Sequence, residues 1–305
     1  MKKIILLFIV NYSLNLSCQE RLSLDRLASK YTLSSFEEFK RLLSIPNDAN
    51  EKIDIEKNIE WTEEEFGERG FRVSKIITKG APLLLAKRDF TSKGQTVLIY
   101  LQMDGQPVDP SKWNQENPYS PVLKKKSSSG GWETINWEQI YKYDDDWRIF
   151  ARSASDAKGP VSMFLAAIDA IDENGITPNY NIKVILDFEE EMGSPNLPSA
   201  VKKNRDLLNS DVLIILDGPR HRLNRPTLTF GARGIATIQL TTYGPIVPQH
   251  SGHFGNYVPN PALRLSKILA SMKDENGKVT IEGYYDGIEI TPDVKKILDS
   301  TPHNE

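Results

Sequence analysis

The sequence predicts an α/β protein in which a mostly parallel sheet is flanked by helices, followed by a smaller α+β unit. Four apolar runs are typical of buried strands: "PLLLAK", "VLIYL", "IKVILDF" and "DVLIILDG". Helical patterns alternate with the later runs, and this alternation favours parallel strands. From Gly234 the pattern changes, and "IATIQLTTY" places apolar residues on alternate positions, as in a strand buried on one face. A second unit is therefore expected there.

Two helices are predicted before the first strand. Ser35-Phe-Glu-Glu38 has the form of a capping box, which predicts a helix N-terminus at Ser35, and Pro46 ends that run. A second helix should end at Gly70, with apolar or small residues at helical spacing: Ile55, Ile59, Thr62 and Phe66.

Two further helices are expected later in the chain. Pro160 opens one of them, and Gly175 closes it. Asn260-Pro261 precedes the other, whose apolar face comprises Leu265, Ile268, Leu269 and Met272. The segment from Ser111 to Asp146 is polar and aromatic and contains "KKKSSSGG", so it is interpreted as a long excursion or flexible loop.

The first eighteen residues have the layout of a bacterial secretory signal. "MKKIILLFIVNYSLNLSCQE" begins with two lysines, continues with an apolar stretch, and ends in small and polar residues before Cys18. Cys18 is the only cysteine, so no intramolecular disulfide can form. "NLS" before it resembles a lipobox, although Asn15 replaces the expected aliphatic residue. A lipidated Cys18, an ordinary cleaved signal and a short buried N-terminal helix are the alternatives; export as a periplasmic or membrane-anchored lipoprotein is the prediction.

Composition excludes several classes of function. Among 305 residues, 39% are hydrophobic and 26% are charged, which is typical of a globular protein. The formal net charge of −3 gives no electrostatic reason to expect nucleic acid as a partner. No later segment is long and apolar enough to span a membrane, so a membrane is expected as a partner only through a lipidated Cys18.

Acids follow three of the predicted strands. Asp104 comes after "VLIYLQM", Glu189 to Glu191 follow "IKVILDF", and Asp217 follows "DVLIIL"; a further acid, Asp156, precedes a predicted helix. The carboxyl ends of parallel strands meet at one edge, and carboxylates gathered there repel unless they protonate or bind cations. A divalent metal site is one interpretation. The alternatives are turn-formers or helix caps, and a solvated loop for the run of glutamates.

Five motifs resemble those of metallopeptidase family twenty, the co-catalytic zinc hydrolases. They occur in the family's order as "LIYLQMDGQPVDP", "ARSASDAKGP", "DFEEEMGSPNL", "LDGP…RPTLTFGARG" and "QHSGHFGNYVPNPA". The resemblance runs from about Leu33 to the C-terminus and is greatest for the dipeptidase branch. It implies three segments: a signal over residues 1–18, a catalytic domain over 19–230, and a partial inserted lid and dimerisation domain over 231–305.

The resemblance also implies a role for each site residue. Two zinc ions would be bridged by Asp156, with Glu191 and Asp217 each ligating one of them. Glu190 would be the general base, and Asp104 would orient the metal ligand at position 102. His250, in the lid, would reach the active site of a partner subunit in a homodimer and steady the developing oxyanion.

Two departures from the family pattern affect these expectations. The family has histidine where this chain has Gln102, and an amide oxygen is a weaker zinc ligand that suits harder cations such as Mn²⁺. The sequence also stops at "TPHNE", inside the expected lid, before the family's remaining histidine ligand. His303 does not match that histidine's motif, and His221 and His253 are expected to be surface or turn residues.

These features together predict a metal-dependent hydrolase of peptide or N-acyl amide bonds, in an incomplete chain with reduced activity. The alternative is a non-catalytic relative that retains the fold as a binding or structural module, which Gln102 and the missing segment favour. Glycosidase chemistry by paired carboxylates would use Glu190 and Asp104, but it leaves Asp156, Glu191 and Asp217 without a role.

Overall fold

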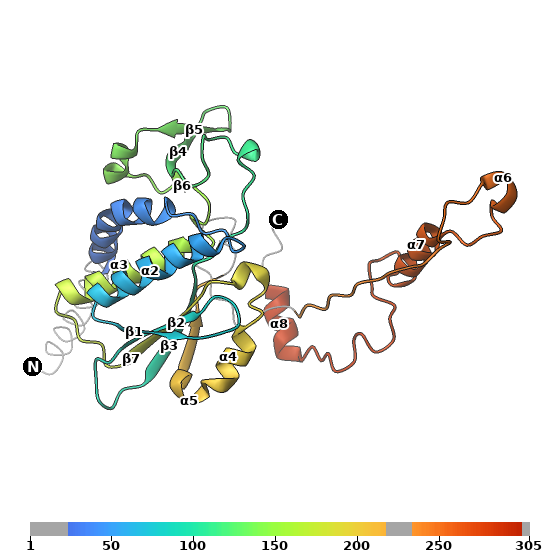
Figure 1. Ribbon diagram of the computed structural model, residues 1–305. Coiled ribbons are helices and arrows are strands. Elements are labelled where there is room, and N and C mark those ends of the chain that lie inside the picture. Colours follow the sequence, from blue (N-terminus) through green and yellow to red (C-terminus); the bar gives the residue numbers. More distant parts are fainter. Residues whose placement is uncertain (1–23, 218–233, 301–305) are drawn as a thin grey trace, which may run out of the picture. The chain divides into compact units, whose positions relative to one another are not determined.

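The computed structural model describes residues 24–217 and 234–300 (Figure 1). The chain separates into two compact units, Met1–Arg225 and Pro226–Glu305, and each is described by itself. The predicted signal with Cys18, and the predicted domain boundary at residues 230 and 231, lie outside the described residues. Among the helices that are described, none has both the length and the apolar character needed to cross a bilayer.

The first unit is built on a five-stranded sheet in the order β1-β2-β7-β3-β8. The strands are β1 (Arg72–Ile76), β2 (Leu83–Arg88), β3 (Thr96–Gln102), β7 (Asn181–Asp187) and β8 (Val212–Ile215). β3 runs parallel to both of its neighbours, β7 and β8, whereas β2 is antiparallel to β1 and β7. The predicted α/β class is confirmed, and the strands that carry the predicted acids form its parallel part.

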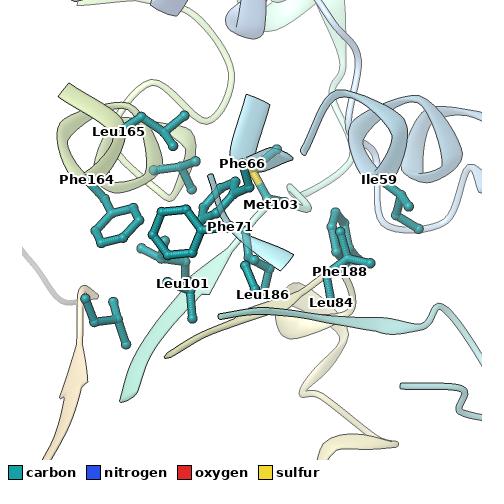
Figure 2. Close-up of a cluster of buried hydrophobic side chains, with 14 of the residues drawn as sticks. Ile59, Phe66, Phe71, Leu84, Leu101, Met103, Phe164, Leu165, Leu186 and Phe188 are labelled. Carbon is teal, nitrogen blue, oxygen red and sulfur yellow. The ribbon is translucent and has the colours of Figure 1, made fainter. Parts of the chain in front are cut away.

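Helices cover both faces of this sheet (Figure 1). The helix of residues 24–43, α2 (Lys52–Glu68) and α3 (Lys158–Glu173) contribute to one apolar core with β2, β3 and β7. Figure 2 shows part of that core, in which Phe66 of α2 and Phe164 of α3 gather with Leu101 and Leu186 of the sheet. On the other face, α4 (Leu197–Lys203) and α5 (Arg205–Leu208) cover a smaller core. The predicted helices ending near Gly70 and opening near Pro160 are therefore confirmed.

The first helix does not begin where the capping-box pattern predicted. Residues 24–43 are continuously helical, so Ser35 lies inside the helix and not at its N-terminus. The Ser35 hydroxyl donates to the carbonyl oxygen of Thr32 at 2.9 Å, one turn earlier. Serine inside a helix commonly bonds back in this way. Upstream of it, Tyr31 is buried and its hydroxyl donates to Glu173 at 2.7 Å, which ties this part of the helix to α3.

The segment predicted as a long flexible loop contains regular structure. It holds η1 (Pro110–Lys112), β4 (Val122–Lys126), β5 (Trp132–Ile135) and η2 (Trp137–Lys142), and is followed by β6 (Arg148–Phe150). These strands form a small antiparallel sheet in the order β5-β4-β6. The rings of Trp132 and Phe150 pack edge to face with centroids 5.1 Å apart. Of the two alternatives, the flexible loop was wrong, because the polar composition concealed these aromatic contacts. The segment is an excursion that forms a sheet of its own.

The described part of the second unit, residues 234–300, contains α6 (Ser251–Phe254), α7 (Pro261–Ser271) and α8 (Pro292–Ser300). α7 is the helix predicted after Asn260-Pro261, and the Asn260 side chain caps it by accepting from the N–H groups of Ala262 and Leu263. The strand predicted in "IATIQLTTY" is not formed, since residues 235–243 have no regular secondary structure. A strand needs a hydrogen-bonding partner, and residues 234–300 contain no second strand to supply one.

Candidate metal centre

The parallel strands bring the predicted site residues to one edge of the sheet. Gln102 ends β3 and pairs in register with Asp187, the last residue of β7. On the other side of β3, the N–H of Leu216 donates to the carbonyl oxygen of Tyr100 at 3.2 Å, which continues the pairing beyond β8. Asp217 therefore follows along the same edge as Gln102.

Asp104 lies just beyond the end of β3 and is almost fully buried. One carboxylate oxygen, Oδ2, accepts a hydrogen bond from the N–H of Glu191 at 3.0 Å. The other, Oδ1, is buried without a hydrogen-bond partner among the described residues, as is Oε1 of Gln102. Burial and the neighbouring charge of Asp187 raise the pKa of Asp104 to about 6. The structure thus shows Asp104 holding the backbone at Glu191, and its predicted action on residue 102 stays a prediction.

Electrostatic interactions show which acids are neighbours. The pKa of Glu190 is raised to about 7, first by burial and then by the negative charges of Glu191, Asp217, Asp104 and Asp156. Charges act in this way only at short range in a partly buried site. Glu190 therefore lies near enough to the other four predicted acids for their charges to act on it, while their individual roles stay predictions.

Asp156 occupies the turn immediately before α3, and its peptide bond to Ala157 is cis. The pKa of Asp156 is raised by burial and by repulsion from Glu191 and Asp217, and the nearby cation of Arg152 opposes the shift. Asp156 therefore lies near enough to Glu191 and Asp217 for their charges to act on it.

The loop that carries Glu190 and Glu191 is held by acids that the sequence interpretation left without a role. Asp187 accepts hydrogen bonds from Tyr100 Oη at 3.0 Å, from Ser194 Oγ at 2.7 Å and from the N–H of Glu189 at 3.0 Å. An acid inside the apolar run "VILDF" is a signal of a buried, bonded carboxylate, and it could have identified Asp187 in advance.

Glu189 anchors the same loop to the β1–β2 hairpin. Its Oε1 accepts from the N–H of Ala81 at 3.0 Å, and its Oε2 accepts from Asn196 Nδ2 at 2.7 Å. Gly80 lies so close that a Cβ atom added there would be 1.9 Å from Glu189 Oε1. Three consecutive glutamates give no indication in the sequence of which one is buried, so this role could not be predicted.

Gln106 fixes the side chain of Glu191. Its Nε2 donates to Glu191 Oε2 at 2.8 Å, while Asp104 holds the backbone of the same residue. Glu191 is therefore oriented from two sides by residues of the turn after β3. The sequence offers no signal for this contact, because it depends on how the two turns meet.

The donors at this edge fit a divalent cation in kind. They are carboxylates and one amide, and Gln102 Oε1 is a buried acceptor that lacks a partner among the described residues. Residues 24–217 and 234–300 contain no group of three His, Cys, Asp or Glu side chains already close enough to hold a metal ion. The roles of Asp156, Glu191, Asp217 and Gln102 as metal ligands therefore stay predictions.

His250, the predicted oxyanion residue, lies in the second unit. Its Nδ1 accepts from the N–H of Gly252 at 3.1 Å and so caps the short helix α6. The ring of His253 lies close, with a centroid separation of 5.0 Å, and both residues are exposed. The role of His250 at the acids stays a prediction. His221 and His303 lie outside the described residues.

The fold and the strand-end acids define an α/β protein with a candidate metal centre, and comparison with known proteins identifies its family. Residues 98–293 match Peptidase family M20/M25/M40, and the chain belongs to this family. The family inferred from the motifs is thereby confirmed.

Its relatives include dipeptidases. The chain is 30% identical over 221 residues to the Cys-Gly metallodipeptidase dug1 of Schizosaccharomyces pombe, covering 72% of this chain and 42% of the relative. It is 30% identical over 257 residues to the cysteinylglycine-S-conjugate dipeptidase of Corynebacterium striatum, covering 81% and 51%. The chain thus spans about half the length of these curated relatives.

Solved structures agree with the fold. The M20 family metallo-carboxypeptidase Sso-CP2 from Sulfolobus solfataricus is 27% identical and superimposes with a TM-score of 0.68, over 88% of this chain and 56% of that one. Human carnosine dipeptidase 1, at 21% identity and a TM-score of 0.62, covers 92% of this chain and 59% of its own, and supports the fold alone.

Proposed function

We propose that this chain carries the catalytic acids of a metal-dependent hydrolase that cleaves peptide or N-acyl amide bonds, with dipeptides as the favoured substrates. The observation that carries the proposal is that β3 pairs in parallel with β7 and β8, so that the acids after these strands, Asp104, Glu190, Glu191 and Asp217, follow one edge of the sheet. The charge of Asp156, before α3, also acts on Glu190. Its relatives, named as Cys-Gly and cysteinylglycine-S-conjugate dipeptidases, support dipeptides as the substrate class.

The metal would be held by Asp156 between two positions, with Glu191 at one and Asp217 at the other. Gln102 would contribute its amide oxygen. Zinc is the expected ion. Mn²⁺ or another hard divalent ion is the alternative, because such ions bind an amide oxygen, as in Gln102, better than they bind imidazole. When bound, two such ions polarise the scissile carbonyl and acidify a water molecule.

The protein's own contribution is to position these acids and to move a proton. Glu190 adjoins Glu191 but is assigned no metal, so its carboxylate is available as the general base that takes a proton and returns it to the leaving amine. Asp104 and Gln106 orient Glu191 through its backbone N–H and its carboxylate. Glu191, the proposed metal ligand, is thereby held by residues other than Glu190, the proposed base.

Three further parts of the proposal rest on the family resemblance and the sequence pattern. His250 of a partner subunit would steady the developing oxyanion in a homodimer. Cys18 would carry a lipid, and the protein would be exported to the periplasm or anchored there at a membrane.

The test compares the chain with a Glu190→Gln variant on Cys-Gly, β-Ala-His and N-acyl amino acids, with Zn²⁺ or Mn²⁺ supplied. Product is measured by mass spectrometry after long incubation, because Gln102 in place of a histidine ligand predicts a low rate. We expect Glu190→Gln to lower the metal-dependent rate by a factor of at least about 10². Glu133→Gln, an exposed acid of β5, is the matched control and should leave the rate unchanged.

Equal rates in the chain and in Glu190→Gln would contradict the proposal. They would favour the non-catalytic alternative, in which the family's architecture persists as a binding or structural module.

A further inference from the structure

The turn that follows the first helix contacts both of the turns that present Asp104 and Asp156. Lys158, two residues after Asp156, is fully buried and extends to the C-terminus of the helix of residues 24–43. Its Nζ donates to the carbonyl oxygens of Leu42 at 3.0 Å and Ile45 at 2.6 Å. The start of α3 is therefore tied directly to the end of the first helix.

Asn47, in the same turn, bonds to both acid-bearing segments. Its fully buried side chain donates from Nδ2 to the carbonyl oxygen of Met103 at 2.9 Å and to Ser153 Oγ at 3.0 Å. Met103 precedes Asp104, and Ser153 begins the turn that leads to Asp156. One amide group thus lies between the two turns and bonds to each.

The backbone of this turn completes the connection. The N–H of Ala49 donates to the carbonyl oxygen of Gly105 at 3.0 Å, and Asp48 forms an isolated parallel bridge with Gly105. A Cβ atom on Gly105 would lie 2.5 Å from Ser153 Oγ, so a larger residue there would force the Ser153 side chain, which bonds to Asn47, to shift. Residues on either side of Asp104 are therefore fixed to residues 47–49.

We propose that residues 42–49 form a clasp that sets the separation of Asp104 and Asp156, with Asn47 and Lys158 as positioning residues of the metal centre. The inference rests on the proposed function for its catalytic meaning. Its physical basis is that each bond is buried, where loss of one partner leaves a polar group unsatisfied and is costly. Bonds to such outer residues affect a metal site through the ligands that they orient.

The two variants that break the clasp have close matches elsewhere in the protein. Lys158→Met is matched by Lys183→Met, because Lys183 Nζ also donates to two backbone carbonyls, those of Leu207 and Asn209. Asn47→Ala is matched by Asn181→Ala, because Asn181 Oδ1 holds the N–H groups of Phe90 and Thr91 at the opposite end of β7.

The first test measures hydrogen exchange and needs no metal. Lys158 contacts no atom of residues 103–106 through its side-chain bonds, yet the clasp predicts that Lys158→Met increases exchange there by at least about tenfold. Lys183→Met should leave exchange at residues 103–106 unchanged. Increased exchange confined to residues 42–45 and 156–160 in Lys158→Met would overturn the inference.

If Lys158→Met does not fold, Asn47→Ala provides the reciprocal measurement. The N–H of Lys158 donates to the carbonyl oxygen of Ser153 at 3.0 Å and is not contacted by Asn47. We expect its exchange to rise in Asn47→Ala and to stay as in the wild type in Asn181→Ala. Equal exchange at Lys158 in both variants would overturn the inference.

The second test titrates Mn²⁺ and follows binding by electron paramagnetic resonance. Asn47→Ala and Lys158→Met should weaken binding by about tenfold or more, and both controls should stay within about twofold of the wild type. Clasp variants that bind as the controls do would show that these residues stabilise the fold only.

Asp156→Asn separates this inference from the proposed function. Unchanged Mn²⁺ binding in Asp156→Asn would refute the metal assignment, and the exchange measurement would still decide on the clasp. Loss of binding in Asp156→Asn, with normal binding in the clasp variants, would refute the clasp alone.

Discussion

β7 and β8 are both apolar runs that pair in parallel with β3, yet their surroundings differ. In β7, Ile185 is 3% exposed and Leu186 is fully buried, whereas in β8 Val212 is 44% exposed and Ile215 is 55% exposed. β7 lies between β2 and β3 and is covered on both faces, while β8 is the outermost strand of the sheet among the described residues. An apolar run therefore determines that a segment forms a strand, whereas the elements packed around that strand determine how far it is buried.

The same contrast divides the candidate site. Glu190 and Glu191 follow the buried strand, in a loop that Asp187 and Glu189 hold by buried hydrogen bonds. Asp217 follows the exposed strand. An exposed, apolar outer strand is also a place where another chain can pair. The acids after β7, on one side of Gln102, are thus held more rigidly than the acid after β8 on the other side.

The largest expected effect comes from a matched pair of isoleucines. Ile185 and Ile215 both pair with Tyr100, one on each side of β3. Ile185→Ala should lower the free energy of unfolding by about 2–5 kcal/mol, because it leaves a cavity in a packed core. Ile215→Ala should cost less than about 1 kcal/mol, since the side chain is already largely in water. Urea denaturation measures both, and equal losses would contradict the comparison.

A second pair tests the hydrogen bonds on the two sides. Asp187→Ala removes the acceptor of three hydrogen bonds, two of them from the loop after β7, and should cost about 3 kcal/mol. Asp211 directly precedes β8, and Asp211→Ala removes one bond, which the exposed N–H of Thr96 at the start of β3 donates to it, so this change should cost about 1 kcal/mol. The same denaturation experiment applies, and a smaller loss for Asp187→Ala would show that the β7 loop is held by other contacts.

The pH dependence of stability should distinguish Lys158, which is fully buried, from Lys183, which is only partly buried. Burial lowers the pKa of Lys158 from its ordinary value of 10.5 to about 7. Between these values the unfolded chain binds the proton and the folded protein does not, so the free energy of unfolding should rise with pH from about 7 to 10.5. Lys158→Met should remove that rise.

Lys183, whose pKa is also lowered by burial but which is only partly buried, serves as the control. Lys183→Met should change the pH dependence much less. Denaturation at several pH values checks the difference, and parallel curves for the wild type and Lys158→Met would contradict it.

The smallest expected effect concerns Gln102. Imidazole is a better zinc ligand than an amide oxygen, so Gln102→His should strengthen zinc binding by about tenfold, or about 1.4 kcal/mol. Gln139→His, on the exposed surface of η2, controls for a histidine added anywhere. Equal zinc affinity in the wild type and Gln102→His, measured by calorimetry, would show that position 102 does not limit binding.

Much of the fold could be predicted from local patterns. The periodicity of Ile55, Ile59 and Phe66 predicted α2, and the apolar runs predicted β2, β3, β7 and β8, because each pattern reflects burial within one element. Predictions that depended on distant partners were less successful. The strand expected at residues 235–243 has no partner among the described residues, and the sheet of β4, β5 and β6 depends on packing between separated segments.

The candidate site shows the same division. The exposed or strand-end acids could be found because acids after apolar runs interrupt a clear pattern. The roles of Asn47 and Lys158 could not be predicted, because their bonds join distant segments. Asn47 and Ser153, like Lys158 and Leu42, are more than a hundred residues apart in the sequence. A buried lysine next to an acid is indistinguishable in sequence from a solvated one.

The most direct test of the convergent metal site is a crystal structure of the protein soaked in Zn²⁺, with the ions located by anomalous scattering. The account predicts zinc within about 2.0–2.2 Å of an Asp156 carboxylate oxygen, with Glu191 or Asp217 completing the contact. Zinc bound elsewhere, or an Asp156 carboxylate turned away from both Glu191 and Asp217, would contradict it.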